Sequence, residues 1–485
     1  MEENVNNIKR KSLTSFAWRM GEGLIAEGMT FVVSMILARL LMPEEFGIVA
    51  LSGIFLAIFS VFANCGLGQA LIQKKEVDDL DANTVFYAGL GLSVVLYVVL
   101  FCGAPLVAKI FKQPMVAPLM RVSGLTLFLS SYNSVQTAEI SRALDFKKFF
   151  FVGIISSLVS GAVGVAMAFT GLGVWALIGQ QVSYQFTRTI ALNRIIRWMP
   201  KLQFSKERFR SLFSYGINLM GAGVIGMVFN QMKGFLIGLK YQPADLSYYN
   251  RGESMPSILC NNINGTVNQI MLPALSKLQN DPEALKHGIR RAMMLSSYLL
   301  FPMMFGLVAV APNIITILFS EKWLPSVPFL QVIAVGYCFS ILSSTNLMAV
   351  SAIGRSDIVL KLEYIKKPLF LALLIGAMYI SPLAIATAVS VNYVFALIFN
   401  SWPNKQLINY SLLEQWKDLY PQFLLSIFMS LVVWGIKFVG LSLYLSFFVQ
   451  LFVGCLTYVG LSYLFKLEAF TYAKSTLKQL MNRGI

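Results

Sequence analysis

The sequence predicts an all-α membrane protein of about fourteen transmembrane helices, in two pseudo-symmetric six-helix lobes followed by two further helices. Three observations support this fold class. The chain of 485 residues is 56% hydrophobic and only 13% charged, whereas soluble domains carry about a quarter charged residues. Apolar runs of about 20 residues, long enough to cross a bilayer, recur along the chain. A weak internal match also relates two stretches about 200 residues apart.

The first predicted hairpin covers residues 14–64 and carries unusual charges. Its first apolar run ends at Arg39, and the chain turns at Pro43 before the next run begins. Arg19, Glu22 and Glu27 lie inside the first run. A charge at membrane depth costs a few kcal/mol or more unless it faces a bundle interior or water. We therefore expect this helix to line a polar cavity.

The internal match repeats the hairpin in the second half of the chain. Gly21–Gly23 corresponds to Gly221–Gly223, and Pro43–Phe46 corresponds to Pro243–Leu246 at the same offset. Such a match is typical of transporters built from two related halves. It predicts two helical lobes that face each other across a polar cavity.

The apolar runs and the basic segments define the expected domains. Expected spans are 14–40, 46–66, 84–107, 116–140, 149–170, 173–196, 211–238, 255–278, 290–318, 325–350, 360–380, 383–402, 419–438 and 441–465. The basic stretch 198–210 is the expected cytoplasmic linker. It separates an N-terminal lobe, residues 1–197, from a C-terminal lobe, residues 211–402. Residues 403–485 hold the last two helices and a basic cytoplasmic tail.

The positive charge of the chain is explained by membrane topology. The net charge is +16, and Lys and Arg gather on one side of the expected spans throughout. This bias places both termini in the cytoplasm, and no nucleic acid is expected as a partner. The five cysteines have neither metal-ligand nor disulfide spacing. We expect no metal, no cofactor and no catalytic residue.

Polar residues follow helical spacing on several expected spans. The sets are Gln181, Tyr184, Gln185 and Arg188; Asn261, Asn264 and Asn268; Asn133, Gln136 and Glu139; and Asn218, Asn230 and Lys233. Lipid offers these groups no hydrogen-bond partner, so they should point inward. Two interpretations stay open: they line a substrate cavity, or they only hydrogen-bond between helices.

The candidate substrate-binding residues come from these polar faces and from the first hairpin. They are Arg19, Glu22, Gln181, Tyr184, Arg188, Asn218, Asn230, Lys233, Asn261 and Asn264. Glu22 and Glu27 are also candidates for a proton or cation site coupled to transport. For Glu22 an ion pair with Arg19, three residues earlier, remains the alternative.

Several sequence motifs resemble one known family. They include ARLLMPEEFGIVAL (38–51), GLGQALIQKK (66–75), SRALDFKKFF (141–150), GLGVWALIG (171–179), YYNRGESMPSI (248–258), LPALSKLQND (272–281), SEKWLPSVPFL (320–330) and AIGRSDIVLK (352–361). They resemble the polysaccharide exporters of the multidrug/oligosaccharidyl-lipid/polysaccharide flippase superfamily, most closely the colanic-acid and teichuronic-acid branch, whose members are also called lipopolysaccharide biosynthesis proteins. The resemblance implies a bacterial inner-membrane flippase for undecaprenyl-pyrophosphate-linked oligosaccharides, the repeat units of surface polysaccharide.

Two other functions are weighed against this one. A multidrug or cation antiporter of the same superfamily would need an acidic cavity, whereas the deep charges here are mixed to basic. A polytopic polysaccharide-assembly enzyme would need a catalytic group on a sizeable loop, and no such loop is expected. The expected partners are the lipid-linked oligosaccharide and membrane lipids, with a polysaccharide polymerase and glycosyltransferases as candidate protein partners.

Overall fold

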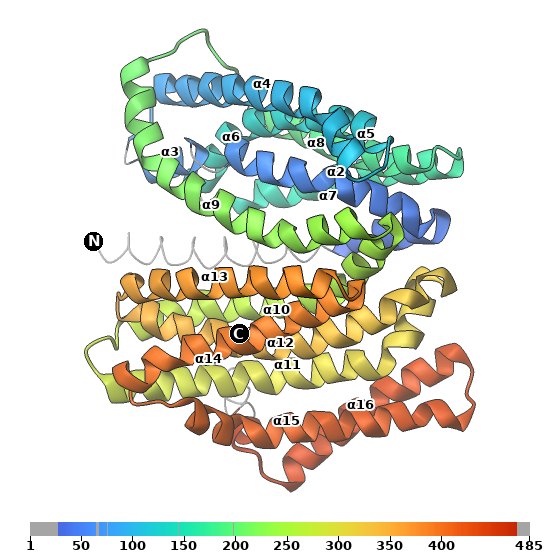
Figure 1. Cartoon of the computed structure of the whole chain (residues 1–485). Coiled ribbons are helices and arrows are strands. Elements are labelled where there is room, and N and C mark those ends of the chain that lie inside the picture. Colours follow the sequence, from blue (N-terminus) through green and yellow to red (C-terminus); the bar gives the residue numbers. More distant parts are fainter. Residues whose placement is uncertain (1–27, 65–66, 75, 144, 197, 473–485) are drawn as a thin grey trace. The chain divides into compact units, whose positions relative to one another are not determined.

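The computed structural model describes residues 28–472 except 65–66, 75, 144 and 197, and this part of the chain is helical with short connections (Figure 1). The helices are α2 (Pro43–Asn64), α3 (Leu67–Gln73), α4 (Asp79–Ile110), α5 (Val116–Gly124), α6 (Thr126–Ala143), α7 (Phe146–Phe169), α8 (Val174–Ile196), α9 (Lys206–Lys240), α10 (Pro243–Ser276), α11 (Pro282–Phe319), η1 (Glu321–Ser326), α12 (Val327–Ala352), α13 (Ser356–Met378), α14 (Pro382–Leu407), α15 (Leu412–Gly435), η2 (Ile436–Val439) and α16 (Leu443–Leu464). A helical segment Gly28–Leu40 precedes α2. The prediction of an all-α fold is confirmed.

Eight helical stretches of the described chain are long and apolar enough to cross a membrane. They contain α2, α4, α7, α11, α12, α14, α15 and α16. Helices α6, α8, α9, α10 and α13 also have at least 18 residues, but their sequences are more polar. Because polar helices at membrane depth must face protein or water, these are the helices expected to line a cavity. The count of fourteen spans stays a prediction.

Some helix boundaries differ from the expected ones. Helix α10 begins at Pro243, whereas the sequence predicted a span from residue 255. The expected span 116–140 is interrupted at Leu125, between α5 and α6. Helix α3 has only 7 residues and was not predicted, because an apolar run this short cannot cross a bilayer.

The two matching turns in the sequence have the same local structure. The backbone N–H of Met42 donates to the Glu45 carboxylate at 2.7 Å. At the corresponding place the N–H of Gln242 donates to the Asp245 carboxylate at 3.1 Å. In both turns the helix begins at a proline. The acidic side chain two positions later accepts a hydrogen bond from the backbone N–H of the residue before that proline, as in a capped helix start. The internal match therefore marks a repeated helix–turn–helix.

The contacts divide the chain into two compact units, one ending at Ser247 and the other beginning at Tyr248. In the first unit α2 packs on α9 and α5, α4 packs on α5 and α6, and α8 packs on α7 and α6. In the second unit α12 packs on α14 and α11, and α15 packs on α11 and α16. This division lies within α10, and the assignment of two six-helix lobes with a linker at 198–210 stays a prediction.

The basic linker segment is held against the first turns of α4. The N–H of Lys201 donates to the Asn83 side chain at 2.9 Å, and the N–H of Ser205 donates to the Thr84 hydroxyl at 3.2 Å. Asn83 and Thr84 are both fully buried. The segment is thus an ordered part of the first unit that fixes where α9 begins.

An acidic cluster at the same end of α4 completes this attachment. The Asp81 carboxylate is fully buried and accepts from Lys74 at 2.5 Å and from Arg208 at 3.0 Å. Asp78 also contacts Arg208 at 3.2 Å and caps α4 through a capping box. Because Arg208 lies in the first turn of α9, this cluster joins α9 to α4 and to the segment that follows α3.

The second unit is joined by buried amides. Asn346 of α12 and Gln415 of α15 exchange two hydrogen bonds of 3.0 and 2.9 Å. The Asn404 amide of α14 donates to the Asn346 side chain at 2.6 Å. All three are at most 2% exposed. Interhelical hydrogen bonds of this kind hold helices together where apolar packing against lipid gives no preference.

The repeated turns meet at Gly47, which yields the first prediction. A Cβ at Gly47 would lie 1.8 Å from the carbonyl oxygen of Pro243, whereas a Cβ at Gly53 in the same helix meets nothing within 4 Å. We expect Gly47→Ala to destabilise the protein by at least about 1–3 kcal/mol, because the backbones must separate. Gly53→Ala is the control and should be neutral or slightly stabilising. Thermal unfolding of the purified protein measures both, and equal stabilities would contradict the contact.

The acidic cluster yields the second prediction. Asp81→Asn removes a buried carboxylate that accepts from two cations, and we expect it to destabilise the protein by about 2–3 kcal/mol. Asp79→Asn is the matched control. Its carboxylate pairs with Lys201 but is 66% exposed, so its loss should cost at most about 1 kcal/mol. Thermal or denaturant unfolding distinguishes the two, and a larger loss for Asp79→Asn would contradict the assignment.

Candidate functional site

Polar side chains of three helices meet around one cavity in the first unit, which we call the polar pocket. Its volume is about 270 Å³. It is lined by Gly68, Gln69 and Ile72 of α3, by Ser130, Asn133, Ser134, Thr137 and Ala138 of α6, and by Gln185 and Arg188 of α8. The polar residues of α6 follow the i, i+3, i+4, i+7 spacing of one helix face.

Hydrogen bonds between the helices hold the walls in place. The Gln185 amide donates to the Ser130 hydroxyl at 3.3 Å, which joins α8 to α6. The Arg142 guanidinium at the end of α6 donates to the carbonyls of Leu71 and Ile72 at 3.0 and 3.2 Å. These carbonyls belong to the last turn of α3, where a helix leaves its acceptors unsatisfied. Arg142 therefore fixes the short α3 against α6.

Among the described residues that line the polar pocket, Arg188 is the only one with a charged side chain. It is half-buried. Among the described residues it forms no ion pair within 4.0 Å, and no hydrogen bond from its guanidinium is found there. A guanidinium presents five N–H donors in a planar fork. The pocket therefore offers an uncompensated positive charge and free donors to an anionic ligand.

Asn133 is the second feature that points to a ligand. Its side chain is only 5% exposed, yet within the described chain neither its Nδ2 nor its Oδ1 has a hydrogen-bond partner. Leaving a buried polar group unpaired costs about 1–3 kcal/mol, so proteins rarely retain one for stability. An amide held in this way is ready to donate to and accept from a bound molecule.

The predicted site residues of the first unit are only partly brought together. Arg188 lines the polar pocket, whereas Gln181 is exposed and Tyr184 is half-buried on α8, and neither is among the lining residues. On α9, Asn230 is exposed and Lys233 is half-buried. Arg19, Glu22, Glu27 and the side chain of Asn218 lie outside what the structure describes.

The predicted residues of the second unit lie on α10. Asn261 is exposed. Asn264 is half-buried and accepts a hydrogen bond of 2.8 Å from the Ser344 hydroxyl of α12. It also lies 3.4 Å from the Cys260 sulfur. The contacts of Asn264 fit the alternative interpretation, in which the amide bonds between helices. Whether any of these candidates binds substrate stays a prediction.

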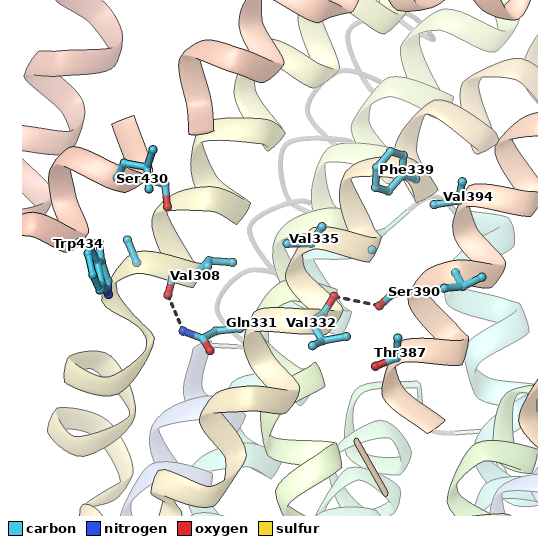
Figure 2. Close-up of a pocket in the computed structure, with 14 residues that line it drawn as sticks. Val308, Gln331, Val332, Val335, Phe339, Thr387, Ser390, Val394, Ser430 and Trp434 are labelled. Atoms are coloured by element: carbon cyan, nitrogen blue, oxygen red, sulfur yellow. Dashed lines mark hydrogen bonds between the residues drawn. The ribbon is translucent and has the colours of Figure 1, made fainter. Parts of the chain in front are cut away.

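The second unit has a cavity of a different kind. This pocket (Figure 2) has a volume of about 720 Å³. It is lined by Val308, Ala309, Gln331, Val332, Val335, Gly336, Phe339, Thr387, Ser390, Val391, Val394, Ser430, Leu431 and Trp434. Its polar side chains bond to the backbone: Gln331 to the Val308 carbonyl at 3.1 Å and Ser390 to the Val332 carbonyl at 2.9 Å. The described residues of this wall are thus apolar in effect, and none of them is charged.

Sequence reasoning missed several walls of the polar pocket. Ser130, Ser134 and Thr137 follow the same helical spacing as Asn133, so this signal was present in the sequence. Gln69 lies on α3, whose position depends on contacts with α6 that the sequence does not reveal. Of the described residues, no group of three or more His, Cys, Asp or Glu could hold a metal ion.

Comparison with solved structures identifies the fold. The fold is similar to that of the lipid II flippase MurJ in an inward closed conformation, with a TM-score of 0.71, 16% identity, and coverage of 91% of this chain and 98% of that chain. It is also similar to an inward-facing multidrug resistance MATE family transporter of the MOP superfamily, with a TM-score of 0.62, 13% identity, and coverage of 82% and 99%. The chain therefore has the fold of a multi-span helical membrane transporter.

The family follows from the sequence. Residues 36–328 match the family model described as polysaccharide biosynthesis protein, which is more than half of the chain, and the chain belongs to this family. The succinoglycan biosynthesis transport protein ExoT of Rhizobium meliloti is 26% identical over 68% of this chain and 67% of its own length. The lipopolysaccharide biosynthesis protein WzxC of Escherichia coli is 23% identical over 81% and 80%. The teichuronic acid biosynthesis protein TuaB of Bacillus subtilis is 22% identical over 78% and 79%. The resemblance identified from the motifs is confirmed.

The unpaired amide yields a prediction about stability. Asn133→Leu replaces a buried amide that has no protein partner with an apolar group of similar size. We expect the free energy of unfolding to stay the same or rise by about 1–2 kcal/mol. The control is Asn193→Leu on α8, because the Asn193 side chain accepts a hydrogen bond of 3.0 Å from the Tyr132 hydroxyl and its loss should destabilise. Unfolding of both variants is compared with wild type, and a destabilised Asn133→Leu would contradict the assignment.

Proposed function

We propose that this protein moves a lipid-linked oligosaccharide across the membrane, as a flippase for surface-polysaccharide repeat units. The cargo class is an oligosaccharide joined to undecaprenyl pyrophosphate. The observation that carries the proposal is the polar pocket, in which a single uncompensated arginine lies among amides and hydroxyls within an apolar helical fold. The relatives named for succinoglycan transport and for lipopolysaccharide and teichuronic acid biosynthesis support the same class of cargo.

The physical problem is the headgroup. Moving sugars and phosphates through hydrocarbon without partners costs many kcal/mol, because each polar group loses its hydrogen bonds to water. Amides and hydroxyls can replace these bonds, and Arg or Lys can pair with the anionic groups. The polyprenyl chain can remain in the lipid throughout. A transporter whose two related halves open to one side at a time then completes the transfer by alternating access.

The alternative is a multidrug or cation antiporter. The fold alone does not separate the two functions, because it is similar to that of a multidrug transporter as well. The charge of the polar pocket separates them. A cationic drug requires acidic or aromatic partners, whereas the described residues that line the polar pocket carry one charge, the positive charge of Arg188. The pocket therefore favours an anionic, hydroxyl-rich cargo.

The remaining parts of the proposal follow from topology and chemistry. We place the protein in the bacterial inner membrane with both termini in the cytoplasm, in accordance with the positive-inside distribution of Lys and Arg. It acts as a transporter and not as an enzyme, since the polar pocket presents no acid–base or nucleophile pair. A polysaccharide polymerase and glycosyltransferases are its proposed protein partners, because they consume and produce the cargo.

Complementation tests the function. We expect the full chain to restore surface polysaccharide in a strain that lacks its own repeat-unit exporter, and to deplete the lipid-linked repeat unit that accumulates there. Its expression should not raise resistance to a panel of organic cations. Polysaccharide is measured by surface uronic acid and total sugar, and resistance by growth and dye efflux. Increased efflux of organic cations without restored surface polysaccharide would overturn the flippase function and support the antiporter function.

A further inference from the structure

The charge of the polar pocket matches one negative charge on the ligand. Its lining residues carry a single cation, Arg188, and no acidic side chain is among them. Lys233, the other cation with a described position among the candidate site residues, does not line this pocket. A ligand with one negative charge would neutralise the site, and a neutral ligand would leave the guanidinium unpaired.

The donors and acceptors around Arg188 match a sugar ring. Asn133 offers two N–H donors and one carbonyl acceptor with no protein partner in the described chain. Gln69 and Thr137 add an amide and a hydroxyl from α3 and α6, and the Ser134 hydroxyl, which donates to the Ser131 carbonyl at 2.8 Å, can still accept. A sugar hydroxyl both donates and accepts, as side-chain amides and hydroxyls do. The neutral part of the pocket therefore suits sugar hydroxyls, and the guanidinium fork suits a planar carboxylate bound bidentately.

The size of the pocket limits the ligand to one sugar residue. Pockets for drug-sized molecules measure about 300–1,000 Å³, and this one measures about 270 Å³. A complete repeat unit with its lipid cannot fit, so the rest of the cargo must lie outside.

We propose that the polar pocket recognises one carboxylate-bearing sugar of the repeat unit, with Arg188 pairing with the carboxylate and Asn133 bonding to its hydroxyls. This inference rests on the proposed function and adds the class of cargo: an acidic oligosaccharide. Gln185 is a positioning residue, since its amide donates to the Ser130 hydroxyl and joins the two helices that carry Arg188 and Asn133.

The pyrophosphate of the lipid linker is the competing anion. It carries at least two negative charges, and proteins bind such groups with several cations, with helix N-termini or with a metal ion. The polar pocket has one cation, and Arg188 lies in the interior of α8, far from its N-terminus at Val174. The geometry thus favours a singly charged, planar group over a diphosphate.

Ligand-induced stabilisation of the purified full-length protein in lipid nanodiscs tests the chemistry. The probes are D-glucuronate, D-glucose and inorganic pyrophosphate at about 50 mM, because weak binding to the folded state still raises the melting temperature. The variants are Arg188→Gln, Arg188→Lys and Asn133→Leu. Arg194→Gln is the matched control, since Arg194 is exposed on the same helix and does not line the pocket.

We expect glucuronate to raise the melting temperature of the wild type and of Arg194→Gln more than glucose does. Arg188→Gln should weaken the apparent affinity for glucuronate at least about tenfold, as expected for a lost charge-assisted hydrogen bond. Arg188→Lys should retain part of it, and Asn133→Leu should weaken binding without lowering the stability of the free protein. Equal shifts with glucose, no shift with glucuronate, or a pyrophosphate shift that Arg188→Gln abolishes would each overturn the inference.

A paired export assay separates this inference from the proposed function. Two host strains lack their own exporter and make repeat units that differ only in one sugar, glucuronic acid or its neutral counterpart. We expect Arg188→Gln to lower export of the acidic polymer about tenfold and to leave the neutral polymer within about twofold of wild type. An equal loss for both polymers overturns the inference and leaves the flippase function standing. Failure of the wild-type chain to export either polymer overturns the proposed function itself.

Discussion

The organising constraint of this protein is that polar groups inside an apolar helical fold need partners from the protein itself. Most of them have such partners. Asn346, Asn404 and Gln415 bond to one another in the second unit, and Asp81 accepts from two cations in the first. Asn133 and Arg188 are exceptions within the described chain. Other buried groups of the first unit, such as Asn83 Nδ2 and Gln136 Oε1, also lack a partner there, but Asn133 and Arg188 line the same pocket, and this pairing supports the proposed site.

The two cavities show that polar lining residues alone do not define a site. Gln, Ser and Thr line both of them. In the second unit, however, Gln331 and Ser390 donate to backbone carbonyls of α11 and α12, which uses their hydrogen-bonding capacity inside the protein. In the first unit the capacity of Asn133 is unused. The two cavities differ in whether their polar side chains already form hydrogen bonds within the protein, and this depends on tertiary contacts and not on residue type.

Local features of the fold could be predicted from the sequence, whereas its tertiary contacts could not. The spans follow from apolar runs, and the two repeated turns follow from a proline and an acid whose hydrogen bonds lie within three residues, Met42 to Glu45 and Gln242 to Asp245. Helix α3 depends on Arg142, 71 residues from the carbonyl of Leu71 that it binds. The spacing of Gln185 and Arg188 predicted a polar face, but not that Asn133 would lie opposite without a partner.

The fold is shared by transporters of different cargo, so the function must come from the site and not from the architecture. In this protein the proposed choice of cargo depends on the sign of the charge at position 188 and on whether the amide at position 133 has a partner within the protein. An acidic residue at position 188 would suit a cation, and a partnered amide at position 133 would add only stability. An arginine and an asparagine without protein partners carry a free-energy cost, and a bound anion with hydroxyls would remove it by forming the missing hydrogen bonds. In the proposed site, an anionic cargo with hydroxyls supplies the partners that Asn133 and Arg188 lack, and this is the proposed source of selectivity for such a cargo.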